Sequence, residues 1–202
     1  MKELILASKS PRRRELMKLL GFPFRSVVSH AEERVFPGET PAAHVVRLSE
    51  LKAREAGKRL VGGIVIGSDT VVVLDGDIIG KPESPDEARA MLGRLQGRTH
   101  TVYTGFALHD PEEDRMVSGW EGTDVTMKPM SSVLIGRYVE TGEPLDKAGA
   151  YGIQGYGAVL ISSINGCFFN VMGLPLMRLM AALETFSGGV YGYFGHHAEP
   201  GG

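Results

Sequence analysis

Three consecutive arginines, residues 12–14, stand at the start of an expected helix, directly after Ser10 and Pro11. Serine is a good helix N-cap, and proline suits the first helical position. This end of a helix carries unpaired N–H groups and the positive pole of the helix dipole, so each cation there costs roughly 0.3–1 kcal/mol. Two interpretations remain open. The arginines form a solvated basic turn, or they form an anion site with the helix N–H groups and the hydroxyls of Ser8 and Ser10.

A carboxylate interrupts the most apolar stretch of the chain. Asp69 lies between the β-branched runs 64–66 and 71–74. A buried carboxylate without a partner is very costly, so Asp69 either has a buried partner or lies at a strand end that faces a cleft. The Gly-Ser pair before it favours a strand that ends at this point, and strand ends in α/β proteins commonly border ligand sites. An Asx-turn is the structural alternative.

Four further polar side chains gain meaning only in combination. Lys81 follows an expected hairpin strand, Lys52 lies in an expected amphipathic helix, and Glu33 lies in a polar loop. Each alone is compatible with simple exposure to solvent, although Lys81 would also suit a phosphate as a point charge. Gln154 lies in segment 149–157, where four of nine residues are glycine, which permits close approach of a ligand to the backbone. A flexible connector is the alternative interpretation of this segment.

Several common chemistries lack their motifs. The chain has no G-x-x-x-x-G-K-[ST] phosphate loop, no H-E-x-x-H zinc motif and no G-x-S-x-G nucleophile elbow. The single cysteine, Cys167, excludes an internal disulfide and a cysteine-built metal centre. We expect Cys167 to be a small core residue in a strand.

The elements that must position these side chains alternate between strands and helices. Apolar, β-branched runs predict strands over residues 4–7, 64–66, 71–74, 78–79, 99–108 and 117–127. Capping residues and amphipathic patterns predict helices over residues 11–20, 41–57, 85–97, 132–139 and 175–186. Asn165-Gly166 predicts a hairpin between strands at 158–164 and 167–172. This order predicts an α/β chain with a mixed sheet.

The size and charge of the chain limit the functions open to it. At 202 residues and 43% hydrophobic content, it is long enough for one domain with room for two lobes. We expect that domain to cover residues 1–186, followed by a flexible Gly-rich tail at 187–202. The formal net charge of −2 argues against a nucleic-acid coat protein. No apolar run approaches the roughly 18 residues of a membrane span and no targeting signal is present, so we expect a cytoplasmic protein without membrane association.

Taken together, the short motifs resemble a known family. They occur in colinear order over roughly residues 4–186: A-S-x-S-P-R-R-x-E-L at 7–16, Glu33, V-R-L through K-A at 46–53, G-S-D-T-V-V at 67–72, G-K-P at 80–82, H-T-V-Y-T-G at 100–105, P-L-D-K-A-G-A-Y-G-I-Q-G at 144–155 and G-L-P-L at 173–176. In this combination the sequence resembles the Maf family of house-cleaning nucleotide pyrophosphatases. The segment 151–155 is similar to the branch that acts on dTTP and UTP. Another branch prefers 7-methyl-GTP and differs around residues 12, 70 and 154, and it remains the alternative within the family.

The resemblance implies a fold and a reaction. The fold would be elongated and two-lobed around a twisted mixed sheet, similar in architecture to the inosine triphosphate pyrophosphatases, with the active cleft between the lobes. The enzyme would be a nucleoside triphosphate pyrophosphatase, a nucleotide diphosphatase that hydrolyses its substrate to the monophosphate and pyrophosphate with the aid of Mg²⁺ or Mn²⁺. The resemblance implies a nucleoside triphosphate as the binding partner and no stable nucleic-acid complex, and it leaves a homodimer open.

The resemblance also implies roles for individual residues, which fall into four groups. Asp69 would be the catalytic proton acceptor, with Glu33 and Lys81 as further catalytic residues. Substrate choice would depend on Arg12, Thr70 and Gln154. The phosphates would bind to Ser8, Arg13 and Lys52, with Ser10 added from its place at the helix start. The metal ligands would be Glu33 and Asp69.

A nucleotide- or RNA-binding module without catalysis is the alternative from a different functional class. The arginine cluster alone would support it. The net charge of −2 and the lack of an aromatic stacking motif weaken it. The combination of Glu33, Asp69 and Lys81 favours the enzyme.

Overall fold

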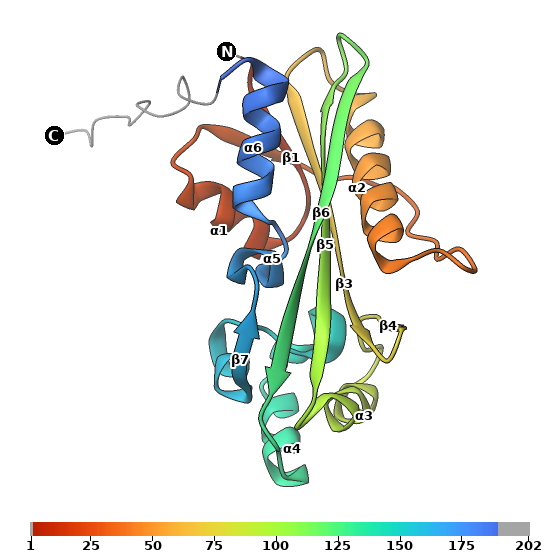
Figure 1. Ribbon diagram of the computed structural model, residues 1–202, viewed down its shortest axis with the longest axis vertical. Coiled ribbons are helices and arrows are strands. Elements are labelled where there is room, and N and C mark those ends of the chain that lie inside the picture. Colours follow the sequence, from red (N-terminus) through yellow and green to blue (C-terminus); the bar gives the residue numbers. More distant parts are fainter. Residues whose placement is uncertain (1, 190–202) are drawn as a thin grey trace, which may run out of the picture. The chain divides into compact units, whose positions relative to one another are not determined.

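The described residues form a seven-stranded sheet in the order β2-β1-β3-β5-β6-β7, with β4 paired to β3 (Figure 1). The computed structural model describes residues 2–189, so the expected tail beyond residue 189 lies outside the described residues. The strands are β1 (Leu4–Ala7), β2 (Phe24–Val27), β3 (Ile64–Leu74), β4 (Asp77–Ile79), β5 (Thr99–Asp110), β6 (Arg115–Met127) and β7 (Ile161–Asn165). Strand β1 is parallel to β2 and β3, whereas β4 is antiparallel to β3 and β7 is antiparallel to β6. The predicted α/β class with a mixed sheet is therefore confirmed.

Apart from the short helix at residues 168–172, where the sequence predicts a strand, the helices lie close to the bounds that the sequence predicts. They are α1 (Pro11–Leu19), α2 (Pro41–Gly57), α3 (Pro85–Leu95), α4 (Ser132–Glu140), α5 (Phe168–Met172) and α6 (Leu176–Ser187). Short 3₁₀ helices are η1 (Glu143–Asp146), η2 (Ala148–Ala150) and η3 (Gly155–Leu160). Within residues 2–189, no helix is long and apolar enough to cross a membrane.

Residue contacts divide the described chain into two compact units. The first unit contains residues 2–69, 104–120 and 173–189, and the second contains 70–103 and 121–172. Strands β3, β5 and β6 contribute residues to both units. The expected single domain over residues 1–186 stays a prediction.

In the first unit, helix α2 packs against β3 and β5 so closely that both strands need a glycine. A Cβ atom at Gly67 would lie 2.1 Å from the carbonyl oxygen of Ser49. A Cβ atom at Gly105 would lie 2.2 Å from the carbonyl oxygen of Val45. The two glycines therefore let the backbone of α2 approach the sheet directly, which fixes the helix and every side chain that it carries.

The predicted strand end before Asp69 is wrong, because β3 runs without interruption from Ile64 to Leu74. Gly67 makes room for α2 rather than ending the strand. The Ser68 hydroxyl is fully buried and lies 2.8 Å from the carbonyl oxygen of Gly105 and 3.0 Å from that of Gly173, so its proton is shared between them. In a continuous strand, successive side chains point to opposite faces, so Asp69 and Thr70 do not share a face.

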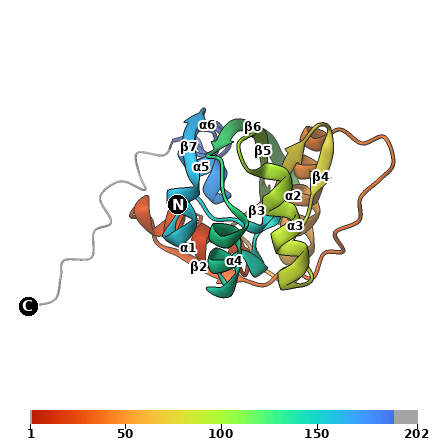
Figure 2. The ribbon, with the colours of Figure 1, turned by 90° about the horizontal axis from the view of Figure 1, so that it is seen from below.

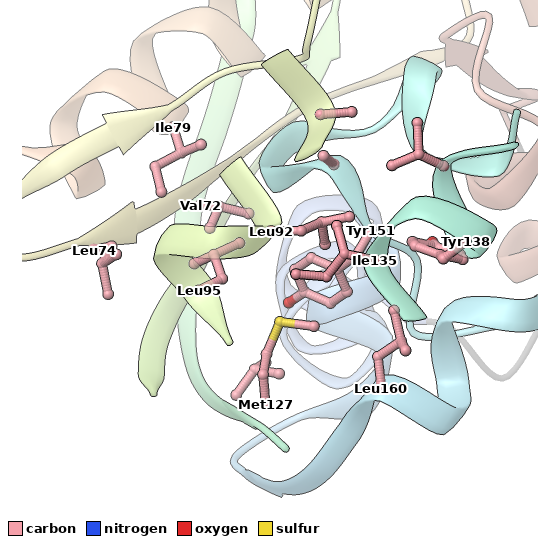
Figure 3. Close-up of a cluster of buried hydrophobic side chains, with 14 of the residues drawn as sticks. Val72, Leu74, Ile79, Leu92, Leu95, Met127, Ile135, Tyr138, Tyr151 and Leu160 are labelled. Atoms are coloured by element: carbon pink, nitrogen blue, oxygen red, sulfur yellow. The ribbon is translucent and has the colours of Figure 1, made fainter. Parts of the chain in front are cut away.

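The second unit has its own core of buried hydrophobic side chains, drawn from β3, β4, β5, β6, the helices α3 and α4 and the segment 150–160 (Figure 3). Helices α3 and α4 lie side by side (Figure 2). Tyr151 enters this core, and its hydroxyl lies 2.7 Å from Nε2 of the buried His100. Burial disfavours the charged imidazolium and lowers the pKa of His100 to about 4. The imidazole is therefore neutral near pH 7.

The predicted hairpin at Asn165-Gly166 is wrong. Strand β7 ends at Asn165, which pairs with Asp124, and helix α5 follows instead of a strand. A two-residue hairpin turn of the Asn-Gly type needs a positive φ at both residues, but Asn165 keeps its strand conformation. Cys167 consequently lies outside any strand and is half-buried, so its predicted place in a strand core is also wrong. Its backbone N–H donates to the Thr123 hydroxyl at 3.0 Å, which holds the chain at the start of α5.

Candidate active site

Asp69 has a buried partner on helix α2. Lys52 Nζ donates to Asp69 Oδ1 at 2.7 Å, and the same ammonium lies 2.7 Å from Glu33 Oε1. Asp69 and Lys52 are buried, whereas the Glu33 side chain is about half exposed. One cation therefore lies between two carboxylates, and the close approach of α2 to β3 brings it there. Of the two possibilities open for Asp69 in the sequence, the buried pair is the one that the structure contains.

The start of α1 has the basic character that the sequence indicates. Ser10 is the N-cap, and its hydroxyl accepts from the Arg13 N–H at 3.4 Å, while the Ser8 hydroxyl accepts from the Ser10 N–H at 3.1 Å. The first turn holds no acidic residue. Each serine hydroxyl uses its oxygen as an acceptor in these bonds, so its proton can still be donated to an anion.

The Arg13 guanidinium links α1 to the carboxylate cluster. Its Nε donates to the carbonyl oxygen of Gly173 at 2.7 Å, and the Ser68 hydroxyl is shared with this same carbonyl. Burial lowers the pKa of Arg13, and Arg12 lowers it further, whereas the negative charges of Asp69 and Glu33 raise it. Arg13 therefore lies within electrostatic reach of both carboxylates. The sequence does not indicate that Ser68 and Gly173 support the site, because the Gly173 carbonyl oxygen meets Arg13 and Ser68 only in the folded chain.

Arg47 holds the loop that carries Glu33. Residues 28–40 contain neither helix nor strand, so Glu33 needs another anchor. Arg47 on α2 donates from Nε and Nη2 to both oxygens of Glu39 at 2.6 Å, and Nη2 also donates to the Arg34 carbonyl oxygen at 2.8 Å. Its guanidinium lies 4.2 Å from the ring centroid of Phe36.

These contacts change the pKa of the Glu39 carboxyl group. The hydrogen bonds from Arg47 lower the pKa of Glu39 to about 2, with a smaller contribution from His44 and against the effect of burial. Arg47 and Lys52 lie on the same helix, so one element fixes both the loop of Glu33 and the cation that Glu33 meets. The sequence motif at 46–53 contained Arg47, but only the folded loop shows what it binds.

Thr70, Lys81 and Gln154 belong to the second unit. Thr70 is half-buried and follows Asp69 in β3, Lys81 is exposed after β4, and Gln154 is exposed directly before η3. The Gly149 N–H donates to the Gly80 carbonyl oxygen at 2.9 Å. This bond connects the turn that carries Lys81 to the segment that leads to Gln154.

The two carboxylates of the first unit are oxygen donors of the kind that a hard divalent cation takes as ligands. Among residues 2–189, no group of three or more His, Cys, Asp or Glu side chains is arranged to hold a metal ion. Mg²⁺ commonly binds through one or two carboxylates together with substrate phosphates, and Glu33 and Asp69 supply such a pair around one ammonium. Two carboxylates would leave the other positions of such an ion to substrate phosphates and water.

Comparisons with known proteins extend over almost the whole chain. The family model described as Maf-like protein matches residues 3–186. A dTTP/UTP pyrophosphatase of Symbiobacterium thermophilum is 50% identical over 186 residues, which cover 92% of this chain and 95% of the relative. A dTTP/UTP pyrophosphatase of Moorella thermoacetica is 47% identical over 192 residues, covering 95% and 99% of the two chains.

Solved structures are also similar to this chain, at low sequence identity. A nucleoside-triphosphatase, or dITP/XTP pyrophosphatase, of Mycobacterium abscessus is 17% identical with a TM-score of 0.43, over 92% of this chain and 96% of that one. Because the family model matches residues 3–186 and these relatives are 50% and 47% identical over almost the whole chain, the chain belongs to the Maf family.

Proposed function

We propose that this protein hydrolyses nucleoside triphosphates, with dTTP and UTP preferred, to the monophosphate and pyrophosphate. The observation that carries the proposal is the buried Asp69 carboxylate in β3, held at 2.7 Å by Lys52, which also meets Glu33 at 2.7 Å. Such a cluster favours an enzyme over a protein that only binds nucleotides, because neither stacking nor phosphate binding needs a buried carboxylate. The name of the relatives, dTTP/UTP pyrophosphatase, supports the choice of base.

Asp69 would accept the proton of a water that attacks the α-phosphorus. Its place inside a strand and its bond to Lys52 keep the carboxylate in one orientation, as a general base requires. Glu33 and Asp69 would hold Mg²⁺ or Mn²⁺ together with phosphate oxygens. When bound, that ion would supply Lewis-acid stabilisation of the charge that develops on those oxygens. Lys52 would limit the repulsion between the two carboxylates.

The start of α1 would bind the phosphate chain. Its N–H groups, the protons of the Ser8 and Ser10 hydroxyls, and the guanidinium groups of Arg12 and Arg13 all favour negative charge. This explains why cations stand at a helix end where the dipole alone disfavours them. Lys81 would add a further point charge for the leaving pyrophosphate.

Gln154 would select the base, with Arg12 and Thr70 as further contributors. Thymine and uracil present an N–H donor at N3 beside carbonyl acceptors, and a glutamine amide offers an acceptor and a donor side by side. A site built on hydrogen bonds discriminates strongly, because the wrong base leaves polar groups of the site without partners. The exposed position of Gln154 leaves its amide available for such pairing.

A panel of nucleotides tests the proposal. Pyrophosphate release would be measured with Mg²⁺ for dTTP, UTP, CTP, GTP and 7-methyl-GTP, and repeated after removal of the divalent cation with EDTA. We expect dTTP and UTP to give the highest kcat/KM and EDTA to abolish release. Preference for 7-methyl-GTP would place the protein in the other branch of the family. Binding of nucleotides without any pyrophosphate release would contradict the proposed enzymatic activity and would favour a nucleotide-binding module without catalysis.

A further inference from the structure

The segment that carries Gln154 is a closed loop of the second unit. Residues 152 and 157 meet at its base, because a Cβ atom at Gly157 would lie 2.2 Å from the Gly152 carbonyl oxygen. Gln154 stands between them and is exposed. Before η3 begins at Gly155, residues 151–154 belong to no helix or strand. Side chains from outside the loop bind its backbone.

One carboxylate binds the far side of this loop. Glu143 accepts from the Tyr156 N–H at 2.8 Å through Oε2 and from the Gly157 N–H at 2.9 Å through Oε1. Gly155 faces the same carboxylate, since a Cβ atom there would lie 2.5 Å from Glu143 Oε2. The three residues that follow Gln154 are thus fitted around Glu143.

Tyr138 extends the same network to the near side of the loop. Its hydroxyl donates to Glu143 Oε1 at 2.9 Å and accepts from the Gly152 N–H at 3.1 Å. Tyr138 is buried in the core, and burial together with the Glu143 charge raises the pKa of its hydroxyl, so the proton stays available for Glu143. The backbone N–H groups of Gly152 before Gln154, and of Tyr156 and Gly157 after it, therefore donate to the side chains of one Tyr–Glu pair.

We propose that Glu143, with Tyr138, is the positioning residue that sets the base preference by holding the loop 152–157 and thereby the amide of Gln154. This role rests on the proposed function of Gln154. Glu143 has two acceptor oxygens for three donors, namely one hydroxyl and two backbone N–H groups. Glutamine has one acceptor oxygen and a donating NH₂ group, so it cannot satisfy all three. The carboxylate is therefore needed for its acceptors and not only for its size.

The first measurement is hydrogen exchange, which does not depend on activity. In Glu143→Gln, we expect the amides of Gly152, Tyr156 and Gly157 to exchange at least about tenfold faster, because each has lost or weakened its acceptor, while amides of β3 stay unchanged. Glu140→Gln makes the same chemical change at an exposed position of α4 and should leave the loop as it is. Unchanged exchange in Glu143→Gln overturns the positioning role, whether or not the protein hydrolyses nucleotides.

The second measurement is a double-mutant cycle on the ratio of kcat/KM for UTP to that for CTP. We expect Glu143→Gln, and to a smaller extent Tyr138→Phe, to lower this ratio about tenfold in the wild-type background. In the Gln154→Ala background neither should lower it further, because they act through an amide that is absent. An equal loss for both nucleotides, or a full further loss in the Gln154→Ala background, makes Glu143 merely structural and overturns the proposal. A wild-type protein that shows no preference for UTP overturns the proposed function of Gln154 and, with it, the role in base choice.

Discussion

The cluster around Asp69 and the loop around Gln154 are built in opposite ways. Asp69 and Lys52 stand on a long strand and a long helix, and they are held by an ion pair at 2.7 Å between buried groups. The loop 152–157 has no regular structure before η3 begins at Gly155, and a Tyr–Glu pair holds it by its backbone N–H groups. In the cluster around Asp69, a strand and a helix hold the side chains in place. In the loop around Gln154, side chains hold the backbone in place.

Under the proposed function, this difference would serve two different demands. Proton transfer and phosphate chemistry lose rate steeply when reacting groups move by an ångström, which favours groups on rigid elements. Base recognition needs a ring to approach backbone and amide groups closely, which favours a glycine-rich loop. Changes in the first region should therefore affect all nucleotides alike, whereas changes in the second should alter the choice between nucleotides.

The largest effect is expected from Asp69→Asn. The amide keeps the size of the side chain and an oxygen for Lys52, but it cannot accept the proton. We expect kcat to fall at least about a hundredfold for every nucleotide, the usual scale for removing a general base, while binding of a non-hydrolysable UTP analogue persists. Pyrophosphate release and calorimetric titration measure the two quantities, with the exposed Asp77→Asn as control. A near-normal kcat at saturating Mg²⁺ would exclude Asp69 as the proton acceptor.

Gln154→Ala should give a smaller but selective loss. We expect kcat/KM for UTP and dTTP to fall by about tenfold to several hundredfold, which corresponds to roughly 1–3 kcal/mol of lost pairing. The loss for CTP and GTP should be much smaller, so the preference shrinks. The same steady-state assay on all four nucleotides checks this. Equal losses for all of them would place Gln154 with the phosphates or the fold, and would remove the contrast between the two regions.

Arg47→Ala should weaken the first region without touching the cluster itself. Losing the bonds to Glu39 and the Arg34 carbonyl frees the loop of Glu33. We expect the Mg²⁺ concentration for half-maximal activity to rise several-fold, with little change in kcat at saturating Mg²⁺, in a titration of activity against Mg²⁺. Arg54→Ala, on the same helix but paired with an exposed aspartate, is the matched control. An unchanged Mg²⁺ requirement would show that Glu33 does not depend on this loop.

The last prediction concerns stability rather than activity, through the neutral His100 in the second unit. Its pKa of about 4 in the folded protein lies below the ordinary 6.5, so the unfolded chain binds more protons between these values. Stability is therefore complete above pH 6.5 and is lost as the pH falls towards 4, by at most about 1.4 kcal/mol per pH unit for one group. In urea unfolding from pH 7 to pH 4, His100→Gln should lose less stability than the wild type. A parallel pH dependence of the two proteins would contradict a neutral, buried His100.

Local chemistry made much of the fold predictable from the sequence. Helix α3 begins where the capping box indicates, with the Ser84 hydroxyl accepting from the Glu87 N–H at 3.2 Å. The basic start of α1 and its serine cap are also found as the pattern predicts. In such places a few neighbouring residues decide the outcome, so the sequence contains the necessary information.

Long-range contacts were not predictable in this way. From the sequence, Gly67 indicates the end of a strand. In the structure, its missing side chain lets the backbone of α2, which is distant in the sequence, pack against β3. Lys52 and Asp69 are 17 residues apart, and their bond depends on that same approach. The resemblance to a family named Lys52, Asp69 and Glu33 together, but it could not reveal what Arg47 and Glu143 bind, because their partners include backbone groups of loops that only the fold brings to them.

The position of bond cleavage tests the central claim most directly. Hydrolysis of UTP in H₂¹⁸O, followed by mass spectrometry of both products, shows which phosphorus the water attacks. We expect one ¹⁸O in UMP and none in pyrophosphate, with the reaction lost in Asp69→Asn. Label in pyrophosphate, release of orthophosphate and UDP, or undiminished turnover in Asp69→Asn would contradict water attack at the α-phosphorus with Asp69 as the base.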